Sequence, residues 1–596
     1  MDKNTVKAMI AMVVFFFAVN FIFSFLYPRK QAPSGQSQNK IEEASTQNNQ
    51  NRLKAGVGGS SEALLSSEEA LVSLSANGES QQSQPANPLR EILVQTPEYK
   101  ALFTESGARL KSFTLNNYKE QRVNPNTPDR PVELVNLTDK SGSLPLSLRL
   151  LVNDSDFLDL SELKFTADKD SLIVDSSGSG QLTFKGKTSK GLVIERVFVF
   201  TPASYLIKQK IRLINQSSGA YSGRLGQTLI ARPFGLLTGR YETVASYLDN
   251  SLKSYKTTNA GSKLKDIQNL SSADWLGFMN QYFLTAMILS GGNGSQREPS
   301  TLALQGFSRP PDGVELVASW PLKLSAEAET VYDFSFFYGP KDEKVLQEAG
   351  YSLNQSIDYG WFSMLGRPMA WLLKLFYGLV GNYGLAIIIV TVLIKIALWP
   401  LTAKSYKSMK ALQKLQPRLT ELKEKHKDNR EAMSREMMQL YKAYKVNPMG
   451  GCLPMLFQIP FFIAFYRVLD YALELRGAPF VLWINDLSSP DRLFHLNFKV
   501  PFLDPPTGIP VLTILMCLSM LWQQKMTPQM GDPMQAKIMM FMPLIFGIIL
   551  LNMPSGLVLY WLVNNLLGIW QQKLINRPEP AAAVVGSANT GGKKKS

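Results

Sequence analysis

The sequence predicts an α-helical polytopic membrane bundle joined to a large extracytoplasmic all-β sandwich domain. Long apolar segments lie at the N-terminal end and in the last third of the 596-residue chain. Several of them approach the roughly 20 residues that a helix needs to cross a bilayer. Between them, short β-rich runs alternate with turn residues, as in sandwich domains. The mean hydropathy of −0.05 therefore averages an apolar part and a polar part.

Residues 1–30 are predicted to form an N-terminal transmembrane anchor. An apolar run extends from Ala8 to Tyr27, with Asn20 and Ser24 as its only polar residues. A cleavable signal peptide is the alternative, but its apolar core is shorter and is followed by small residues. Residues 31–90 form a flexible linker, because a segment without aromatic residues up to Asn87 buries too little apolar surface to fold.

Residues 91–342 are predicted to form the β-domain, a sandwich that folds on its own core. The two cysteines of the chain, Cys452 and Cys517, lie in apolar segments further on, so disulfides cannot hold this domain. Its clearest strands are rich in β-branched and aromatic residues and are bounded by Gly, Ser, Asn and Pro. They are Leu192–Phe200, Tyr205–Ile214, Val314–Leu324 and Thr330–Tyr338.

Residues 343–382 are predicted to connect the β-domain to the membrane through an amphipathic helix. Arg367 and Lys374 interrupt an apolar stripe with helical spacing, formed by Trp361, Leu365, Leu372, Phe376 and Leu379. A helix of this kind lies along the bilayer interface, with tryptophan at the headgroup level. The alternative is a helix that packs on the β-domain.

Five more spans follow the anchor, which makes six. The second span is residues 383–402, and the other four lie within residues 450–576, in apolar segments at about 452–472, 508–523, 537–552 and 554–572. Residues 403–449 contain twelve Lys or Arg residues against five acids, which places this segment in the cytoplasm by the positive-inside rule. Both termini, including the basic tail 577–596, are then cytoplasmic, and the β-domain lies outside.

The cytoplasmic segment 403–449 is predicted to form an antiparallel helical hairpin. Leucines from Leu412 to Leu422 recur at 3-4-3 spacing and apolar residues from Met433 to Tyr444 at 4-3-4 spacing, with a polar break at residues 427–429. It could be a solvated loop, but basic hairpins beside membranes also contact anionic lipid or ribosomal RNA. The candidate contact residues are Lys404, Lys407, Lys410, Lys414 and Arg418.

Lys395 lies in the apolar run Ile387–Pro400, where a charge costs at least about 2.5 kcal/mol. Snorkelling is one interpretation, but the cytoplasmic end near Thr402 is roughly 10 Å away, and a lysine stem covers only part of that. The functional interpretation places Lys395 in a water-containing cavity, with Thr391 one turn earlier on the same face. Asp470 lies roughly 15 Å away in depth, so no counter-ion is indicated.

Other polar or aromatic candidates within the spans are Gln458, Asn564, Asn565, Tyr560 and Trp561, for which hydrogen bonding between helices is the plainer interpretation. Catalytic motifs are hard to find. The two histidines, His426 and His495, exclude HExxH zinc sites and most histidine-dependent nucleophile arrangements. The sequence predicts no cofactor, no metal site and no enzyme activity.

Four motifs resemble those of the YidC/Oxa/Alb family of membrane-protein insertases. They are Asn447–Phe461 (NPMGGCLPMLFQIPF), Pro400–Thr402, Asp532–Pro543 and Pro554–Tyr560. The resemblance covers about residues 358–576. The anchor and the β-domain resemble the Gram-negative bacterial branch, which implies an inner-membrane protein whose periplasmic domain is a β-supersandwich.

The resemblance implies an insertase and folding chaperone that works without ATP hydrolysis. Its hydrophilic groove would carry a positive charge at Lys395, where bacterial relatives typically have arginine, and client contacts at Thr391, Gln458, Tyr560 and Trp561. A tyrosine is usual at the position of Trp561. Arginine stays charged, whereas a desolvated lysine can lose its proton, so hydration of the groove matters here.

The partners implied are nascent membrane proteins, the Sec translocon, membrane lipids and the ribosome, the last through the hairpin and the basic tail; DNA is not expected. Two other classes of function remain open. A secondary transporter would also carry intramembrane charges, but the spans show no internal repeat. An intramembrane protease is the third class.

Overall fold

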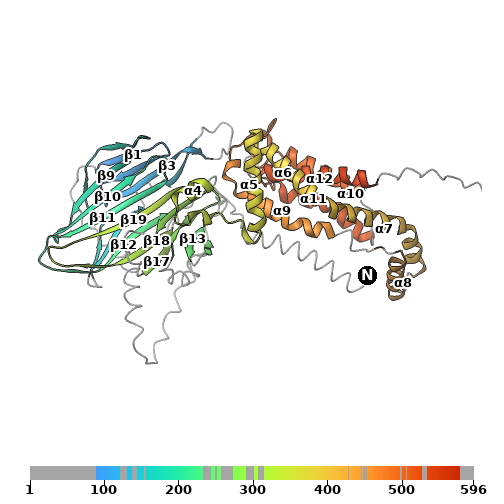
Figure 1. Cartoon of the computed structure of the whole chain (residues 1–596), viewed down its shortest axis with the longest axis horizontal. Coiled ribbons are helices and arrows are strands. Elements are labelled where there is room, and N and C mark those ends of the chain that lie inside the picture. The colour runs from blue at the N-terminus through green and yellow to red at the C-terminus, as the bar shows by residue number, and fades with distance from the viewer. Residues whose placement is uncertain are drawn as a thin grey trace, which may run out of the picture. The chain divides into compact units, whose positions relative to one another are not determined.

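The computed structural model describes most of residues 89–576, and its parts divide after Ile357 into two compact units (Figure 1). The predicted anchor, the linker up to Pro88 and the basic tail 577–596 lie outside the described residues. The described ranges are 89–120, 130–136, 144–152, 156–231, 243–248, 251–256, 273–289, 301–306, 314–426, 429–444, 446, 453–496, 498, 500–504, 507–526 and 533–576.

Within those ranges, the first unit contains three β-sheets. The first sheet has the order β4-β3-β2-β1-β8, from β4 (Pro131–Asn136), β3 (Arg109–Lys119), β2 (Tyr99–Thr104), β1 (Glu91–Gln95) and β8 (Ser171–Ile173). The second has the order β14-β13-β15-β16-β19-β11-β10-β9-β7, from β14 (Ser251–Lys256), β13 (Thr243–Leu248), β15 (Trp275–Met279), β16 (Phe283–Ile288), β19 (Glu329–Pro340), β11 (Leu206–Asn215), β10 (Leu192–Phe200), β9 (Gly180–Lys187) and β7 (Phe165–Ala167). The third has the order β17-β18-β12-β5-β6, from β17 (Thr301–Gly306), β18 (Val314–Leu324), β12 (Tyr221–Ala231), β5 (Leu148–Val152) and β6 (Asp156–Asp159).

The two five-stranded sheets pack on the same face of the nine-stranded sheet. Phe113 of β3 lies 5.2 Å from Tyr338 of β19, and Trp320 of β18 lies 4.8 Å from Phe334 of β19, between ring centroids. Because side chains alternate along a strand, Phe334 and Tyr338 project from one face of β19. The unit is therefore a two-layer sandwich, and the prediction of an all-β sandwich is confirmed.

The four strands predicted from the sequence are confirmed. β10 and β18 have the predicted bounds, β11 begins one residue later than predicted, and β19 is longer at both ends. In β10 every second residue is fully buried while the residues between them are partly exposed. This alternation is the pattern that a strand with one buried face requires, which explains why the sequence indicated it.

A buried guanidinium lies where the three sheets meet. Arg196 of β10 donates hydrogen bonds to the carbonyl oxygens of Gly107 (2.5 Å) and Leu146 (2.7 Å), in the connections that precede β3 and β5. Both acceptors have left-handed backbone, with φ of 66° and 64°. Burial, together with the charge of the nearby Arg109, lowers the pKa of Arg196 to about 9. Arg196 thus ties two irregular connections to the large sheet.

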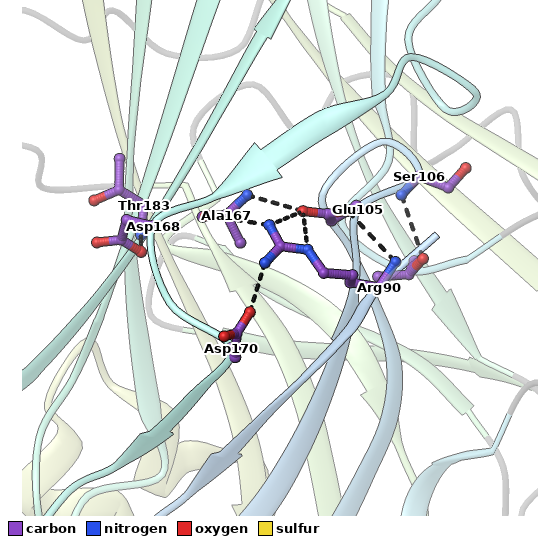
Figure 2. Close-up of polar contacts among 8 residues, drawn as sticks. Arg90, Glu105, Ser106, Ala167, Asp168, Asp170 and Thr183 are labelled. Carbon is purple, nitrogen blue, oxygen red and sulfur yellow. Dashed lines mark hydrogen bonds and ion pairs between the residues drawn. The ribbon is translucent and has the colours of Figure 1, made fainter. Parts of the chain in front are cut away.

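A second polar cluster holds the start of β1 to the β7–β8 connection (Figure 2). Arg90 pairs with Glu105 at 2.7 Å and with Asp170 at 2.5 Å. Glu105 is 3% exposed and also accepts a hydrogen bond from the backbone N–H of Ala167 at 3.1 Å. The carboxylate therefore joins residues more than sixty positions apart in the sequence.

The second unit is helical. Its helices are α5 (Ser363–Val380), α6 (Tyr383–Ala397), α7 (Trp399–Lys425), α8 (Arg430–Ala443), α9 (Leu453–Tyr471), α10 (Val511–Met526), α11 (Pro533–Leu550) and α12 (Ser555–Asn576). The predicted amphipathic helix corresponds to α5, which contacts α6 and α9 and belongs to this unit, whereas the short helix α4 (Glu343–Ala349) belongs to the first.

Among the described residues, no helix taken alone combines the length and the apolarity expected of a membrane span. Tyr383–Ala397 and Trp399–Leu422 meet that standard only as a pair, bent by 64° at the break between α6 and α7. The predicted second span extends to residue 402, but α6 ends at Ala397. The cause is Pro400, which lacks an N–H and clashes with a preceding helical turn, so that a new helix begins there.

The predicted hairpin corresponds to α7 and α8. His426 at the end of α7 lies 3.1 Å from Glu436 of α8, and the Arg418 guanidinium lies 5.1 Å from the ring centroid of Tyr444. His426 thus contacts the middle of α8, and Arg418 contacts the residue that directly follows α8. The leucines Leu412, Leu415 and Leu419 of the predicted stripe are buried.

Candidate functional site

The polar side chains of the helical unit converge on α12. Asn565 donates to the hydroxyl oxygen of Ser519 on α10 at 3.2 Å, and Gln571 donates to that of Thr402 on α7 at 2.6 Å. Gln572 donates to the carbonyl of Met526 at 2.9 Å. Because unsatisfied polar groups are costly in an apolar environment, these contacts fix α12 against its neighbours.

Lys395 of α6 reaches α12 near its middle. Its Nζ donates to the amide oxygen of Asn564 at 3.0 Å, and the residue is 7% exposed. Among the described residues, no carboxylate pairs with this ammonium. A neutral amide orients a cation without cancelling its charge. The hydrogen-bond partner that the structure gives Lys395 is therefore the neutral amide of Asn564.

Gln458 of α9 shares the same acceptor. Its Nε2 donates to Asn564 Oδ1 at 2.8 Å, so one carbonyl oxygen receives hydrogen bonds from α6 and from α9. A carbonyl oxygen has two lone pairs, and both are used here. The structure therefore brings two of the predicted site residues together through Asn564.

Two further polar groups lie near Lys395, one turn along α12 at Gly568. A β-carbon built on Gly568 would lie 3.0 Å from Gln523 Nε2, 3.7 Å from Lys395 Nζ and 3.7 Å from the Tyr406 hydroxyl. The missing side chain at Gly568 leaves room for these groups. We use "Lys395 cluster" for the five polar residues contributed by α6, α7, α9, α10 and α12: Lys395, Tyr406, Gln458, Gln523 and Asn564.

Thr391 and Tyr560 are buried among helices. The Thr391 hydroxyl, 1% exposed, donates to the carbonyl of Ile387 at 2.6 Å in its own helix. The Tyr560 ring is packed edge-on against Phe465, 5.1 Å between centroids. Trp561 is partly exposed and contacts Phe462 at 4.6 Å. Thr391 and Tyr560 thus lie one helical turn before Lys395 and Asn564, and both Tyr560 and Trp561 pack on phenylalanine rings of α9.

The five predicted basic residues of the hairpin fall into two groups. Lys404, Lys407 and Lys414 are exposed on α7. Lys410 donates to the carbonyl of Ile575 at 3.5 Å, at the end of α12, where a cation complements the helix dipole. Arg418 lies over the Tyr444 ring. The first three present charge to the surroundings, while the other two also contact neighbouring helices.

Asp470 lies in the last turn of α9, twelve residues from Gln458. At 1.5 Å per residue this corresponds to roughly 18 Å along the helix. Since Gln458 is bonded to the same amide as Lys395, Asp470 is far from the ammonium. This distance agrees with the separation in depth predicted from the sequence.

Three residues of the Lys395 cluster were not predicted as site residues. Asn564 was interpreted as a contact between helices, and Tyr406 and Gln523 were not singled out. In the sequence each of these three residues is only a polar side chain in or beside an apolar run. That pattern does not indicate which side chains of other helices it contacts. Gly568 gave no signal, because a glycine in a helix is informative only once the neighbouring side chains are known.

Comparison with known proteins gives matches along nearly the whole chain. The family described as "60Kd inner membrane protein" matches residues 375–582, and "YidC periplasmic domain" matches residues 91–372. The membrane protein insertase YidC of Pelobacter propionicus is 38% identical over 584 residues, covering 97% of this chain and 99% of the relative. That of Syntrophobacter fumaroxidans is 38% identical over 505 residues, covering 83% and 87%. A crystal structure of an active YidC insertase covers 83% of this chain and 94% of its own, at 17% identity and a TM-score of 0.35.

Proposed function

Because this chain belongs to the YidC family of membrane protein insertases, we propose that it inserts the transmembrane segments of client proteins into the inner membrane and assists their folding. The observation that carries this proposal beyond the family is the Lys395 cluster. It places a cation, which has no carboxylate partner in the part of the chain that the structure describes, among neutral amides inside a largely apolar bundle. Because a charge in an apolar environment is unfavourable by at least about 2.5 kcal/mol, such a residue indicates a functional site.

The proposed topology has six spans, formed by the anchor in residues 1–30 and by α6, α9, α10, α11 and α12. The basic hairpin α7–α8 and both termini lie in the cytoplasm, and the β-domain lies in the periplasm. The excess of Lys and Arg over acids in residues 403–449 supports this orientation. Helix α5 lies at the periplasmic interface of the inner membrane. Met364 and Trp371 are exposed on it, and Trp361 is exposed in the short 3-10 helix that precedes it.

In the proposed mechanism the Lys395 cluster forms the centre of a hydrophilic groove open to the cytoplasm. The ammonium attracts acidic or polar parts of a client, while the amides of Gln458, Gln523 and Asn564 exchange hydrogen bonds with its backbone. This shortens the path of polar groups through hydrocarbon, and the client then moves sideways into lipid. Trp561, which is partly exposed, lies on the wall along which the client helix slides, and the buried side chains of Thr391 and Tyr560 pack within that wall.

The proposed partners follow from the surfaces of the two units. Lys404, Lys407 and Lys414 offer exposed positive charge to ribosomal RNA or to anionic lipid, together with the basic tail. Insertion proceeds alone or beside the Sec translocon and requires no ATP hydrolysis, because partition into lipid supplies the free energy.

Variants of Lys395 test the role of the charge, with clients that carry acidic outer segments, in a strain depleted of the native protein. Lys395→Leu and Lys395→Glu should reduce insertion by at least about 5-fold, since a cation and a carboxylate about 4 Å apart attract by at least about 1 kcal/mol, even at the dielectric constant of water. Lys395→Arg should retain insertion. The matched control is Lys525→Leu, which removes an exposed lysine at the end of α10. Normal insertion by both the Leu and the Glu variants would refute the role of the charge.

A further inference from the structure

The connection between α9 and α10 exposes three phenylalanine side chains. Phe494, Phe498 and Phe502 are 69%, 63% and 72% exposed. Phe494 is the middle residue of the short strand β20 (Leu493–His495), which pairs with β21 (Gly508–Ile509), and Phe498 and Phe502 lie in the segment between these two strands. Ile509 of β21 is also exposed. Single exposed apolar residues are ordinary, but a group of large aromatic ones marks a surface that binds something apolar.

Inward-facing polar groups hold this connection in place. Arg492 is buried and donates to the carbonyl of Leu551 and to Asn552 Oδ1, both at 2.9 Å. The Asn552 amide in turn donates to the carbonyl of Phe502 at 3.0 Å. The Thr507 hydroxyl donates to the carbonyl of Phe498 at 3.0 Å. The charged group is therefore satisfied internally, and a fixed backbone presents the aromatic rings outward.

The backbone itself is strained at two of these residues. Phe494 and Phe502 have φ of 51° and 66°, in the left-handed region that favours glycine. Such strain persists only where the surroundings over-determine it, and it clusters at functional positions. Glycine or asparagine would form the same turns at lower cost, so the rings have a use that these residues could not serve.

The exposed rings are continuous with the apolar exterior of the helical unit. Leu493 pairs with Ile509, and α10 begins two residues later at Val511. The apolar residues exposed on α10 and α11 include Ile514, Leu515, Leu518, Leu544, Ile545 and Ile548. In the proposed topology this exterior faces lipid, and the hairpin lies at its outer end.

We propose that Phe494, Phe498 and Phe502 insert into the outer leaflet of the membrane and anchor the α9–α10 connection there. Aromatic rings at the boundary between headgroups and acyl chains lose contact with water, while the exposed carboxylate of Asp504 stays at headgroup level. The inference rests on the proposed placement of α10 and α11 as spans.

The α9–α10 connection also sets the depth of α12 in the membrane. The backbone N–H of Ser555 donates to the carbonyl of Ser489 at 2.7 Å, and that of Gly556 donates to the carbonyl of Leu487 at 2.9 Å. The same connection therefore caps the first turn of α12. Rings held in the outer leaflet would keep this helix, and Asn564 on it, at a constant distance from the membrane surface.

Fluorescent labelling in proteoliposomes tests the inference. In full-length protein with Cys452→Ser and Cys517→Ser, single cysteines at Phe498 and Phe502 receive an environment-sensitive dye. We expect blue-shifted emission, loss of most of that emission with a quencher attached high on the lipid acyl chain, and little loss with aqueous iodide. Leu544→Cys on α11 is the control for lipid exposure. Ile173→Cys is the control for water exposure, because Ile173 is an exposed apolar residue of β8 in the other unit.

Each outcome decides one question. If iodide quenches the dye at Phe498 and Phe502 while the lipid-attached quencher quenches it at Leu544, α11 faces lipid as proposed. Insertion of the phenylalanine rings into the outer leaflet is then refuted. If neither quencher reaches the two loop positions, protein rather than lipid covers them, and the inference is also refuted. If lipid fails to quench the dye at Leu544 itself, the proposed topology is wrong instead.

Discussion

The Lys395 ammonium is bound to an amide oxygen, and this choice of partner has a consequence for function. A carboxylate at the position of Asn564 would also satisfy the ammonium, and with a stronger hydrogen bond. It would cancel the charge, however, and leave nothing to attract an acidic client. Asn564 thus satisfies the geometry of Lys395 and Gln458 while the positive charge stays available.

Asn564→Asp should therefore impair insertion without unfolding the protein. The new carboxylate would lie about 3 Å from Lys395 Nζ and neutralise it, so insertion of acidic clients should fall by about as much as in Lys395→Leu. The measurement is client insertion in the depleted strain, with protein level and melting temperature determined alongside. The neutral variant Asn564→Gln is the control for shape, and equal insertion by Asn564→Asp and the native protein would contradict the role of the free charge.

In the β-domain the opposite arrangement occurs, because the buried Glu105 has a charged partner. Burial acts to raise the pKa of Glu105, but the Arg90 side chain, the backbone N–H groups of Ala167 and Arg90, and the Arg90 charge together lower it below its ordinary 4.5. Since the folded state holds this carboxylate ionised more strongly than the unfolded state does, its stabilisation is complete above pH 4.5 and is lost as the pH falls below that value.

Glu105→Gln should remove part of this acid sensitivity. The native protein should lose stability between pH 5 and pH 3 more steeply than the variant, while at pH 7 the variant should be less stable by about 1 kcal/mol, since Arg90 is half exposed. Thermal unfolding followed by circular dichroism at each pH measures both effects. Parallel curves for the two proteins from pH 7 to pH 3 would show that Glu105 contributes nothing to the acid transition.

The sequence is enough to predict Lys395 as a site residue but not the residues that surround it. Lys395 could be predicted because a charge in an apolar run is costly wherever the helix packs. Gln523, Tyr406 and Gly568 could not, because helical periodicity gives the face of a helix but not the partner that the face meets.

At the element scale, α6 begins against the connection that follows α9. A β-carbon on Gly384 would lie 2.0 Å from the ring of Phe480, and the Asn382 side chain donates to the carbonyl of Phe480 at 3.0 Å. The absence of a side chain at Gly384 is therefore what lets this connection close on the first turn of α6. Lys395 lies in the last turn of the same helix, so the fit at Gly384 also sets its position.

Gly384→Ala should lower the stability of the helical unit by about 1–3 kcal/mol, because the added methyl group overlaps the partly exposed ring of Phe480. The control is Gly378→Ala on α5, where a β-carbon would meet nothing within 4 Å and helix propensity alone favours alanine. Melting temperatures of the two variants in the same detergent give the comparison. An unchanged melting temperature for Gly384→Ala would mean that Phe480 moves aside without cost.

The elements that could be predicted are those with a strong local pattern. The alternation in β10 and the leucine stripe of α7 gave correct elements because burial of one face imposes that period. The break between α6 and α7 was missed, although Pro400 was visible, since apolarity continues across it. The connection of residues 473–510 has no period, and its structure depends on buried groups such as Arg492 and Asn552 that meet only in the folded chain.

Across the whole molecule, the basic residues that give the net charge of +15 are spread over both units. The first unit carries exposed lysines as well, including Lys187, Lys208 and Lys253, so net charge alone cannot distinguish a ribosome-binding surface from a merely soluble one. The relevant quantity is the local arrangement on α7, where Lys404, Lys407 and Lys414 are exposed along one helix of the proposed cytoplasmic hairpin.

Two triple variants separate local charge from total charge. Replacing Lys404, Lys407 and Lys414 by Glu, or Lys187, Lys208 and Lys253 by Glu, lowers the formal net charge equally, since each replacement removes one positive charge and adds one negative charge. If the hairpin approaches ribosomal RNA, the first variant should lose most of its co-sedimentation with ribosomes at low salt, and its remaining binding should depend less on salt, because fewer counterions are released. The β-domain variant should bind like the native protein, since its lysines lie on the periplasmic side in the proposed topology. Equal loss in both variants would instead indicate nonspecific attraction by net charge, and the α7 lysines would then have no particular role in ribosome binding.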